Sequence, residues 1–210
     1  MKFKVAIVSD VVCPWCFVGK RRLEKAISQL SEDDFEVDTL PFQLNPDLPD
    51  EEIKLRDYLA QKFGSIDQLE EMEERLEGIA AAEGIAMNFS KITYVANTLK
   101  AHALIQSVKD LDQKMMLKEA LLSAHFEKGL PIGRTETLQQ IATDLKVDFD
   151  PDFEAPEKVN QMSIVEEKLK TQGISAVPTF IINDRYLVQG AQSAETFLKV
   201  FEEIRAKEDT

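Results

Sequence analysis

The hydrophobic pattern at the start of the chain predicts a strand, a helix and a second strand in succession. Residues 3–9 (FKVAIVS) form an apolar, β-branched run that is typical of a strand buried on both faces. Apolar residues at helical spacing follow between Leu23 and Leu30, and residues 35–41 (FEVDTLP) indicate another strand. Strand, helix and strand within about forty residues predict a right-handed parallel βαβ unit.

The middle of the chain has a helical pattern instead. A loop rich in proline follows the second strand, and apolar residues then recur at helical spacing over residues 51–145. The predicted helices, which share this spacing, lie near residues 51–63, 66–83, 93–109, 112–128 and 135–145. A second loop that contains prolines precedes another predicted helix near residues 157–171.

The C-terminal part returns to strand patterns. Residues 179–182 (TFII) and 186–188 (YLV) indicate two strands, and the turn-forming residues 183–185 (NDR) between them predict an antiparallel hairpin. Ser193 is a candidate N-cap for a final helix that runs to about residue 207.

Two strand pairs from opposite ends of the chain predict one shared sheet. Neither pair would be stable alone in water, so we expect a four-stranded mixed sheet. The predicted fold class is α/β, with a discontinuous domain of residues 1–45 and 157–210 and an all-helical insertion of residues 46–156. The helices expected to cover the sheet are those near residues 14–30, 157–171 and 193–207.

Composition and charge narrow the classes of function. The 210 residues are 44% hydrophobic, as in ordinary globular proteins. The net charge of −13 argues against nucleic acid as a partner, because phosphate binding needs concentrated Lys and Arg. No apolar stretch approaches the roughly 20 residues of a membrane span, and the N-terminus lacks the apolar region of a signal peptide. We therefore expect a cytoplasmic protein that does not enter a membrane.

The two cysteines of the chain carry its candidate chemistry. Cys13 and Cys16 follow the first strand and open the first helix, where Pro14 suits the first turn. A helix start favours a reactive thiolate at Cys13, and Cys16 lies one turn on as a resolving thiol. The pair therefore predicts thiol–disulfide exchange. The basic residues Lys20, Arg21 and Arg22 on the same helix are interpreted as a solvated face, and a positive field near Cys13 is the alternative.

A metal site is the main alternative for the cysteine pair. A zinc site would need two further ligands, and only His102 and His125 offer an imidazole. Their spacing does not match that of a zinc finger, so we expect no metal. An accidental pairing of the two cysteines is the other alternative.

Several segments together resemble one known family. Residues 9–16 (SDVVCPWC) and 19–22 (GKRR) are similar to the active-site segment of the DsbA family, in its FrnE-like branch. Residues 97–102 (NTLKAH), 173–180 (GISAVPTF) and 190–192 (GAQ) extend the resemblance in the same order along the chain. The resemblance implies a thioredoxin-like fold with a large helical insertion.

The resemblance also implies that the Val177–Pro178 bond is cis and faces the dithiol. Taken alone, an X–Pro bond is cis in only about 5–6% of cases, and a trans proline that opens a strand is the alternative. A proline at this position would leave the backbone of Val177 free to pair with an extended substrate.

Other site residues are weaker candidates. The resemblance places His102 near the dithiol, where it would polarise a thiolate or orient substrate, whereas His125 is expected to be structural. Asn97 and Gln192 lie in resembling segments and are predicted to bind substrate or shape the site. Trp15 lies between the cysteines, and the sequence leaves open whether it contacts substrate or packs against the insertion.

The predicted function is thiol–disulfide exchange on protein thiols and disulfides or on small thiols. No bound cofactor is expected beyond the redox-active Cys13–Cys16 pair, and glutathione is a candidate co-substrate. The alternative is a glutathione-dependent transferase or isomerase of the kappa class or the 2-hydroxychromene-2-carboxylate isomerase type. Those proteins resemble this chain in layout but typically carry serine in place of Cys13 and lack the second thiol. A binding module with a vestigial dithiol is a third class. The direction of exchange and the choice between monomer and homodimer stay open.

Overall fold

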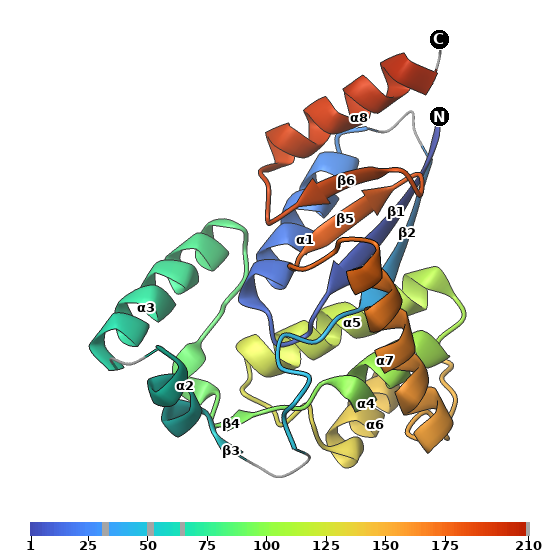
Figure 1. Cartoon of the computed structure of the whole chain (residues 1–210). Coiled ribbons are helices and arrows are strands. Elements are labelled where there is room, and N and C mark those ends of the chain that lie inside the picture. The colour runs from blue at the N-terminus through green and yellow to red at the C-terminus, as the bar shows by residue number, and fades with distance from the viewer. Residues whose placement is uncertain (31–33, 50–52, 64–65, 209–210) are drawn as a thin grey trace.

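A four-stranded mixed sheet joins the two ends of the chain (Figure 1). Its order is β2–β1–β5–β6, with β1 (Lys2–Ser9) parallel to β2 (Asp34–Pro41) and antiparallel to β5 (Thr179–Ile182). The edge strand β6 (Tyr186–Gln189) pairs antiparallel with β5. The predicted union of the two halves in one sheet is therefore confirmed. The computed structural model describes residues 1–30, 34–49, 53–63 and 66–208.

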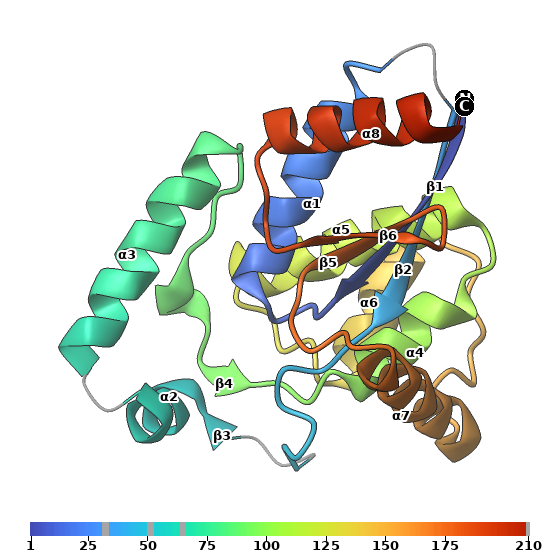
Figure 2. The same cartoon turned by 45° about the horizontal axis from the view of Figure 1, so that its top comes forward.

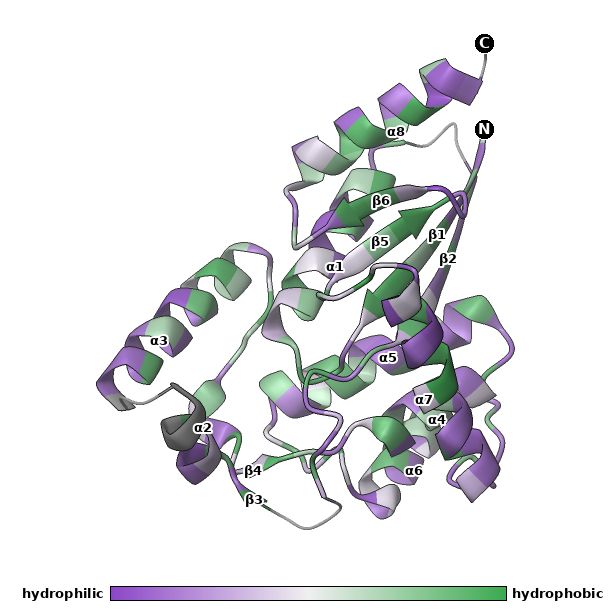
Figure 3. Cartoon of the chain, viewed as in Figure 1, coloured by the Kyte–Doolittle hydropathy of each residue, from purple (hydrophilic) through white to green (hydrophobic). Residues whose placement is uncertain are grey.

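One face of this sheet carries a larger hydrophobic core than the other face. Phe3, Val5 and Ile7 alternate along β1, and Phe180 lies opposite Ile7 in the register with β5. Helices α1 (Pro14–Ile27) and α8 (Ala194–Glu208) pack on this face, and the buried core residues that they contribute are Leu23, Ala26, Ala194, Phe197, Phe201 and Ile204. Hydrophobic residues run along most of β1 and β5, whereas α8 alternates hydrophobic and hydrophilic turns (Figure 3).

Helix α7 (Pro156–Thr171) lies on the other side of the sheet from α8 (Figure 2). Leu169 of α7 packs with Val8 and Phe42, so it covers only the end of the sheet that leads to the cysteines. The predicted set of covering helices was incomplete. Helix α5 (Leu111–Phe126) of the insertion also packs against β2 and beside α1, because its Met115 reaches the core between them.

The C-terminal hairpin and the last helix begin as predicted. Asn183 and Asp184 have φ values of 51° and 56°, which give the turn the backbone twist that favours a tight hairpin. The Thr196 N–H donates a hydrogen bond of 3.2 Å to Ser193 Oγ, so Ser193 caps α8.

The insertion has its own core but is not all-helical, so that part of the prediction was wrong. Strand β3 (Ile53–Lys54) pairs antiparallel with β4 (Tyr94–Val95), and a short 3₁₀ helix covers Phe89–Lys91. The helix expected near residues 93–109 begins only at Leu99, because residues 94–95 are held in this ribbon. That helix is α4 (Leu99–Ser107). The remaining helices, which the pattern predicted to within a few residues, are α2 (Leu55–Phe63), α3 (Ile66–Ala82) and α6 (Thr135–Asp144).

The division into a domain of residues 1–45 and 157–210 and an insertion of residues 46–156 stays a prediction. Helix α7 packs both on α4 of the insertion and on the end of the sheet. In the described part of the chain, no helix is both long and apolar enough to cross a membrane.

Gly19 lets α1 approach the loop that contains Pro178. A Cβ at this position would lie 3.0 Å from Pro178 Cγ, 3.2 Å from Phe180 Cζ and 3.3 Å from Ala191 Cα. These separations are closer than ordinary van der Waals contact, so the absence of a side chain keeps the cysteine helix beside the proline loop.

We expect Gly19→Ala to destabilise the protein by about 1–3 kcal/mol, because the added methyl group overpacks this contact. Gly78→Ala is the matched control: Gly78 lies in α3, and a Cβ there would have no neighbour within 4 Å. That change should stabilise the protein by about 0.5–1 kcal/mol through helix propensity. Urea unfolding of both variants measures the effects, and equal gains at the two sites would contradict the close contact.

Candidate active site

The two thiols lie where β1 ends and α1 begins. Cys13 has an extended backbone (φ −94°, ψ 112°) and caps the helix, and its N–H donates to the Asp10 carbonyl at 3.2 Å. The Cys16 N–H donates to the Cys13 carbonyl at 3.0 Å, which winds the first turn, and Pro14 occupies the start of the helix. Both cysteines are free thiols, with exposed fractions of 4% for Cys13 and 0% for Cys16. Cys13 is thus the outer thiol.

The loop that precedes β5 faces Cys13. The Val177–Pro178 bond is cis, as the resemblance implied, and Cys13 Sγ lies 3.9 Å from the Val177 carbonyl oxygen. In the described part of the chain, the Val177 N–H has no hydrogen-bond partner. This edge therefore offers an unpaired backbone donor beside the outer thiol.

Asp10, which no sequence pattern singled out, links the cysteine loop to the insertion. Its buried carboxylate accepts a hydrogen bond of 2.8 Å from the Leu44 N–H, and His102 Nε2 lies 3.4 Å from Asp10 Oδ1. The structure thus brings His102 of α4 to the dithiol side, against Asp10 instead of a thiol. The position of Asp10 within the SDVVCPWC segment was the signal that could have revealed it.

The remaining predicted residues lie at different parts of the site. Asn97 joins two segments, because its Nδ2 donates to the Leu48 carbonyl at 2.7 Å and its Oδ1 accepts from the Leu99 N–H at 3.0 Å. Gln192 is exposed, and its Nε2 donates a hydrogen bond of 2.8 Å to the Gln189 carbonyl in the same turn. Trp15 is 39% exposed beside the cysteines. Roles in substrate binding stay predictions for all three.

A buried lysine near the cysteines was missed by the sequence analysis. Lys118 of α5 is 1% exposed, and its Nζ donates hydrogen bonds to the hydroxyls of Ser9 and Thr39 at the ends of β1 and β2. Burial lowers the pKa of Lys118 to about 7, although the nearby Cys16 thiol acts to raise it.

The same buried surroundings also shift the pKa of Cys16. Burial first, and then the hydrogen bond with Cys13, raise the pKa of Cys16 well above its usual range, and Lys118 partly counteracts them. The inner thiol therefore stays protonated until a nearby group takes its proton.

The basic residues after the cysteines are not a solvated face, so that interpretation was wrong. Lys20 is buried and pairs with Glu24 and with Glu119 of α5 at 2.7 Å. Arg22 pairs with Glu83 at 2.6 Å and donates to the Ala191 carbonyl at 2.8 Å. These contacts attach the cysteine helix to the insertion and to the loop before α8.

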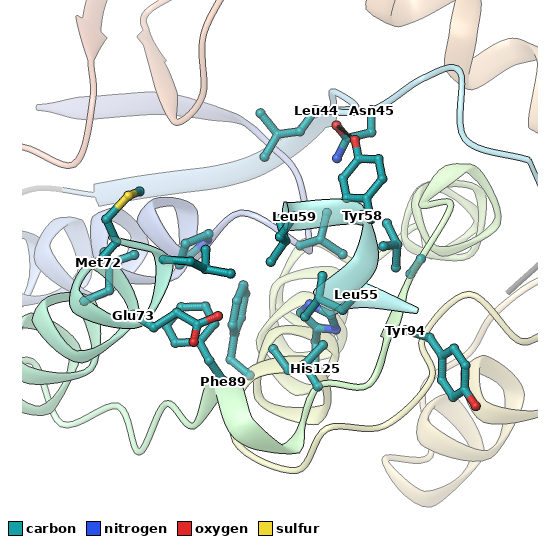
Figure 4. A pocket seen from close by; sticks show the side chains of 18 residues that line it. Leu44, Asn45, Leu55, Tyr58, Leu59, Met72, Glu73, Phe89, Tyr94 and His125 are labelled. Atoms are coloured by element: carbon teal, nitrogen blue, oxygen red, sulfur yellow. Dashed lines mark hydrogen bonds between the residues drawn. The ribbon is translucent and has the colours of Figure 1, made fainter. Parts of the chain in front are cut away.

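A cavity of about 340 Å³ lies next to the loop that carries Cys13, and Figure 4 shows the side chains that line it. Val12 and Pro14 of the cysteine loop form one wall, and Leu55, Leu59, Phe89 and Phe126 of the insertion contribute others. His125 also lines the cavity, although the sequence analysis expected it to be structural. Within residues 1–30, 34–49, 53–63 and 66–208, no group of three or more His, Cys, Asp or Glu side chains could hold a metal ion.

Comparisons with known proteins show what the chain as a whole is similar to. Residues 4–202 match the sequence profile of the DSBA-like thioredoxin domain. The uncharacterized protein YwbO of Bacillus subtilis (strain 168) is 26% identical over 211 residues, which cover 99% of this chain and 100% of that protein. The crystal structure of the probable DsbA oxidoreductase SCO1869 from Streptomyces coelicolor has a TM-score of 0.84 and 27% identity, and covers 96% of this chain and 89% of that chain.

A more distant solved structure shares the fold alone. The cytosolic disulfide reductase DsbM from Pseudomonas aeruginosa, solved with GSH, has a TM-score of 0.64 and 16% identity, and covers 96% of this chain and 99% of that chain. The FrnE-like branch suggested by the sequence stays a prediction.

We expect iodoacetamide to label Cys13 before Cys16 in the reduced protein, because Cys16 is fully buried and its pKa is raised. Mass-spectrometric mapping after a brief reaction at neutral pH measures the order. The unfolded protein, in which both thiols are accessible, is the control. First labelling of Cys16 would contradict the assigned roles.

The Lys118 pKa has a consequence for stability. The unfolded chain keeps this amine protonated up to a pKa near 10.5, and the folded chain only up to about 7. The folded state therefore binds fewer protons between these values, and its stability rises with pH across that window. The free-energy cost of burying the charged Lys118 amine applies in full below about pH 7 and disappears toward pH 10.5.

We therefore expect Lys118→Met to stabilise the protein at about pH 6, and the gain to shrink by about 1.4 kcal/mol per pH unit above pH 7. Urea unfolding in a Cys16→Ser background measures this without titration of that thiol. Lys114→Met is the control, since it removes a lysine that pairs with Asp38 at 2.9 Å, and it should lose stability at both ends of the range. A gain in stability for Lys118→Met that does not change with pH would refute the lowered pKa of Lys118.

Proposed function

Because the chain belongs to the DSBA-like thioredoxin domain family, whose members are disulfide oxidoreductases or isomerases, we propose that it exchanges disulfides through Cys13 and Cys16. The observation that carries the proposal is the position of the outer thiol, at a helix start and 3.9 Å from the Val177 carbonyl beside Pro178. Cys13 is the outer thiol at the helix start, and the second thiol lies one turn away to complete the exchange.

The exchange proceeds in two steps. The Cys13 thiolate attacks one sulfur of a substrate disulfide, the substrate S–S bond breaks, and the other substrate sulfur leaves as a thiol after it takes a proton. Cys16 then loses its proton and attacks Cys13 Sγ, which releases the second substrate thiol. The substrate gains two electrons and two protons, and the protein is left with a Cys13–Cys16 disulfide. The reverse sequence oxidises a substrate dithiol.

Two groups of the protein support these steps. Lys118 has a pKa of about 7 and lies near Cys16, so this amine can take the proton that the inner thiol must lose. The free Val177 N–H and its carbonyl offer an extended substrate a short stretch of backbone pairing beside Cys13. Trp15 adds an exposed aromatic surface on the same side.

Protein thiols and disulfides or small thiols are the proposed partners, with glutathione as a co-substrate that returns the oxidised pair to the dithiol. We also propose a cytoplasmic location, where a glutathione pool is present. The cytosolic reductase DsbM shares the fold and was solved with GSH, which is consistent with both proposals. Glutathione-dependent isomerisation is the rival, because it would use the same surface without a second thiol.

We expect Cys16→Ser to accumulate mixed disulfides on Cys13, because attack still occurs while resolution does not. Cys13→Ser should reduce insulin-disulfide reduction with glutathione to background. Non-reducing electrophoresis and mass spectrometry measure the first effect, and the turbidity of reduced insulin measures the second.

The conservative Ser substitutions leave packing nearly unchanged, so a melting curve for each variant serves as the folding control. If Cys13→Ser kept near-normal activity with glutathione, disulfide exchange would be rejected and the isomerase alternative would take its place. A redox titration of Cys13 and Cys16 against glutathione buffers then gives the direction of exchange.

A further inference from the structure

The cavity near the dithiol could hold a ligand, whereas disulfide exchange by the two thiols does not itself need a cavity. Val12 and Pro14, which line it, flank Cys13 directly in the chain. The cavity therefore begins at the two chain neighbours of the outer thiol and extends between α2, α3 and α5, whose side chains Figure 4 shows. Its volume of about 340 Å³ falls in the range of small-molecule sites, roughly 300–1,000 Å³.

One imidazole, that of His125, lies in the mostly apolar lining, whose other polar side chains are Asn45, Tyr58, Glu73 and Tyr94. His125 of α5 is 6% exposed, and its ring makes an edge-on contact with Phe126, with centroids 4.7 Å apart. In the part of the chain that the structure describes, no hydrogen bond satisfies either ring nitrogen. Burial lowers the pKa of His125 to about 4, so the ring is neutral at physiological pH and can both donate and accept a hydrogen bond.

The charges around the cavity disfavour an anion. Glu73 is the charged side chain among its described lining residues, and it pairs with Arg56 at 3.2 Å. Arg56 also lies 3.8 Å from Glu70, so two carboxylates share its charge. A carboxylate ligand would enter an apolar space without a cation to compensate its lost hydration.

We propose that this cavity binds the uncharged, apolar arm of a small-molecule disulfide whose sulfur reacts at Cys13, and that His125 hydrogen-bonds to a hydroxyl or carbonyl group on that arm. The inference rests on the proposed exchange function and names its substrate class. In the first step, the Cys13 thiolate forms a bond to the sulfur that carries the bound arm, and the other half of the substrate leaves as a thiol.

A small molecule fits these walls better than a segment of protein. A polypeptide side chain carries backbone N–H and C=O groups with it, and the apolar side chains of Leu55, Leu59 and Phe89 offer such groups no hydrogen-bond partner. Backbone groups without partners in such surroundings cost several kcal/mol, about 1–3 each by mutational data. A free aryl or branched alkyl arm carries no such groups.

The test compares two neutral disulfides as oxidants of the reduced protein. Bis(4-hydroxyphenyl) disulfide has an aromatic arm with a hydroxyl group, and bis(2-hydroxyethyl) disulfide has a small polar arm. Single-turnover rates, followed by acid quench and mass spectrometry, give a ratio between the two. Comparing this rate ratio from one variant to another removes the difference in intrinsic reactivity between the two disulfides.

Leu76→Trp fills the cavity from α3, and Glu74→Trp places the same side chain on the exposed side of that helix. We expect the aromatic-to-small rate ratio to fall about tenfold in Leu76→Trp, as the ring loses its apolar site, and to stay unchanged in Glu74→Trp. An unchanged ratio in both variants, with both disulfides still reacting, would overturn the cavity inference and leave the exchange function intact. Failure of both disulfides to oxidise the pair would reject the exchange function itself.

Insulin reduction in the same variants separates the two kinds of substrate. An equal fall in that rate for Leu76→Trp would assign the cavity to protein side chains and overturn the inference. If Leu76→Trp does not fold, equilibrium binding decides: p-cresol should bind the parent protein about fivefold more tightly than toluene, and His125→Leu should abolish that preference. Equal binding of p-cresol and toluene to the parent would reject the role of His125.

Discussion

Strand β1 lies between β2 on one side and β5 on the other, and the antiparallel pairing with β5 determines where the two reactive loops meet. Val8 lies opposite Thr179, so the chain that leaves β1 toward Cys13 passes the residue that follows Pro178. The same register turns Phe3, Val5 and Ile7 into the core. A slip by one residue would expose all three and move the proline loop along the cysteine loop. Core packing therefore selects the alignment that the chemistry needs.

Local sequence signals predicted the parts of the fold that they alone determine. The runs that became β1, β5 and β6, the start of α1 at Pro14 and the cap at Ser193 depend on residues close in the chain. The strands β3 and β4 have two residues each and are defined only by their pairing with each other, so no sequence pattern revealed them. Lys118 could not be predicted for a similar reason. A lysine in a helix is usually exposed, and only the tertiary fold places this one under the ends of β1 and β2.

Helix α5 is the element through which the insertion reaches both parts of the site. Lys118 lies beneath the inner thiol, and His125, two turns later, lines the cavity beside the outer one. The negative charge of Asp10 acts on both, since it raises the pKa of each against the effect of burial. Lys114 of the same helix pairs with Asp38 of β2, and Lys20 of α1 pairs with Glu119. A displacement of α5 would therefore change the redox centre and the cavity together.

The central position of β1 has a consequence for biosynthesis. This strand is made before its partner β5, which follows only after the whole insertion, and at roughly 5–20 residues per second that takes on the order of ten seconds or more. During that interval β1 has only β2 beside it, and an isolated strand pair is marginally stable. Cys13 and Cys16 are thus accessible on the nascent chain before the proline loop and α5 can enclose them. Until β5 is made, the dithiol lacks the enclosure by the proline loop that leaves Cys13 only 4% exposed in the completed fold.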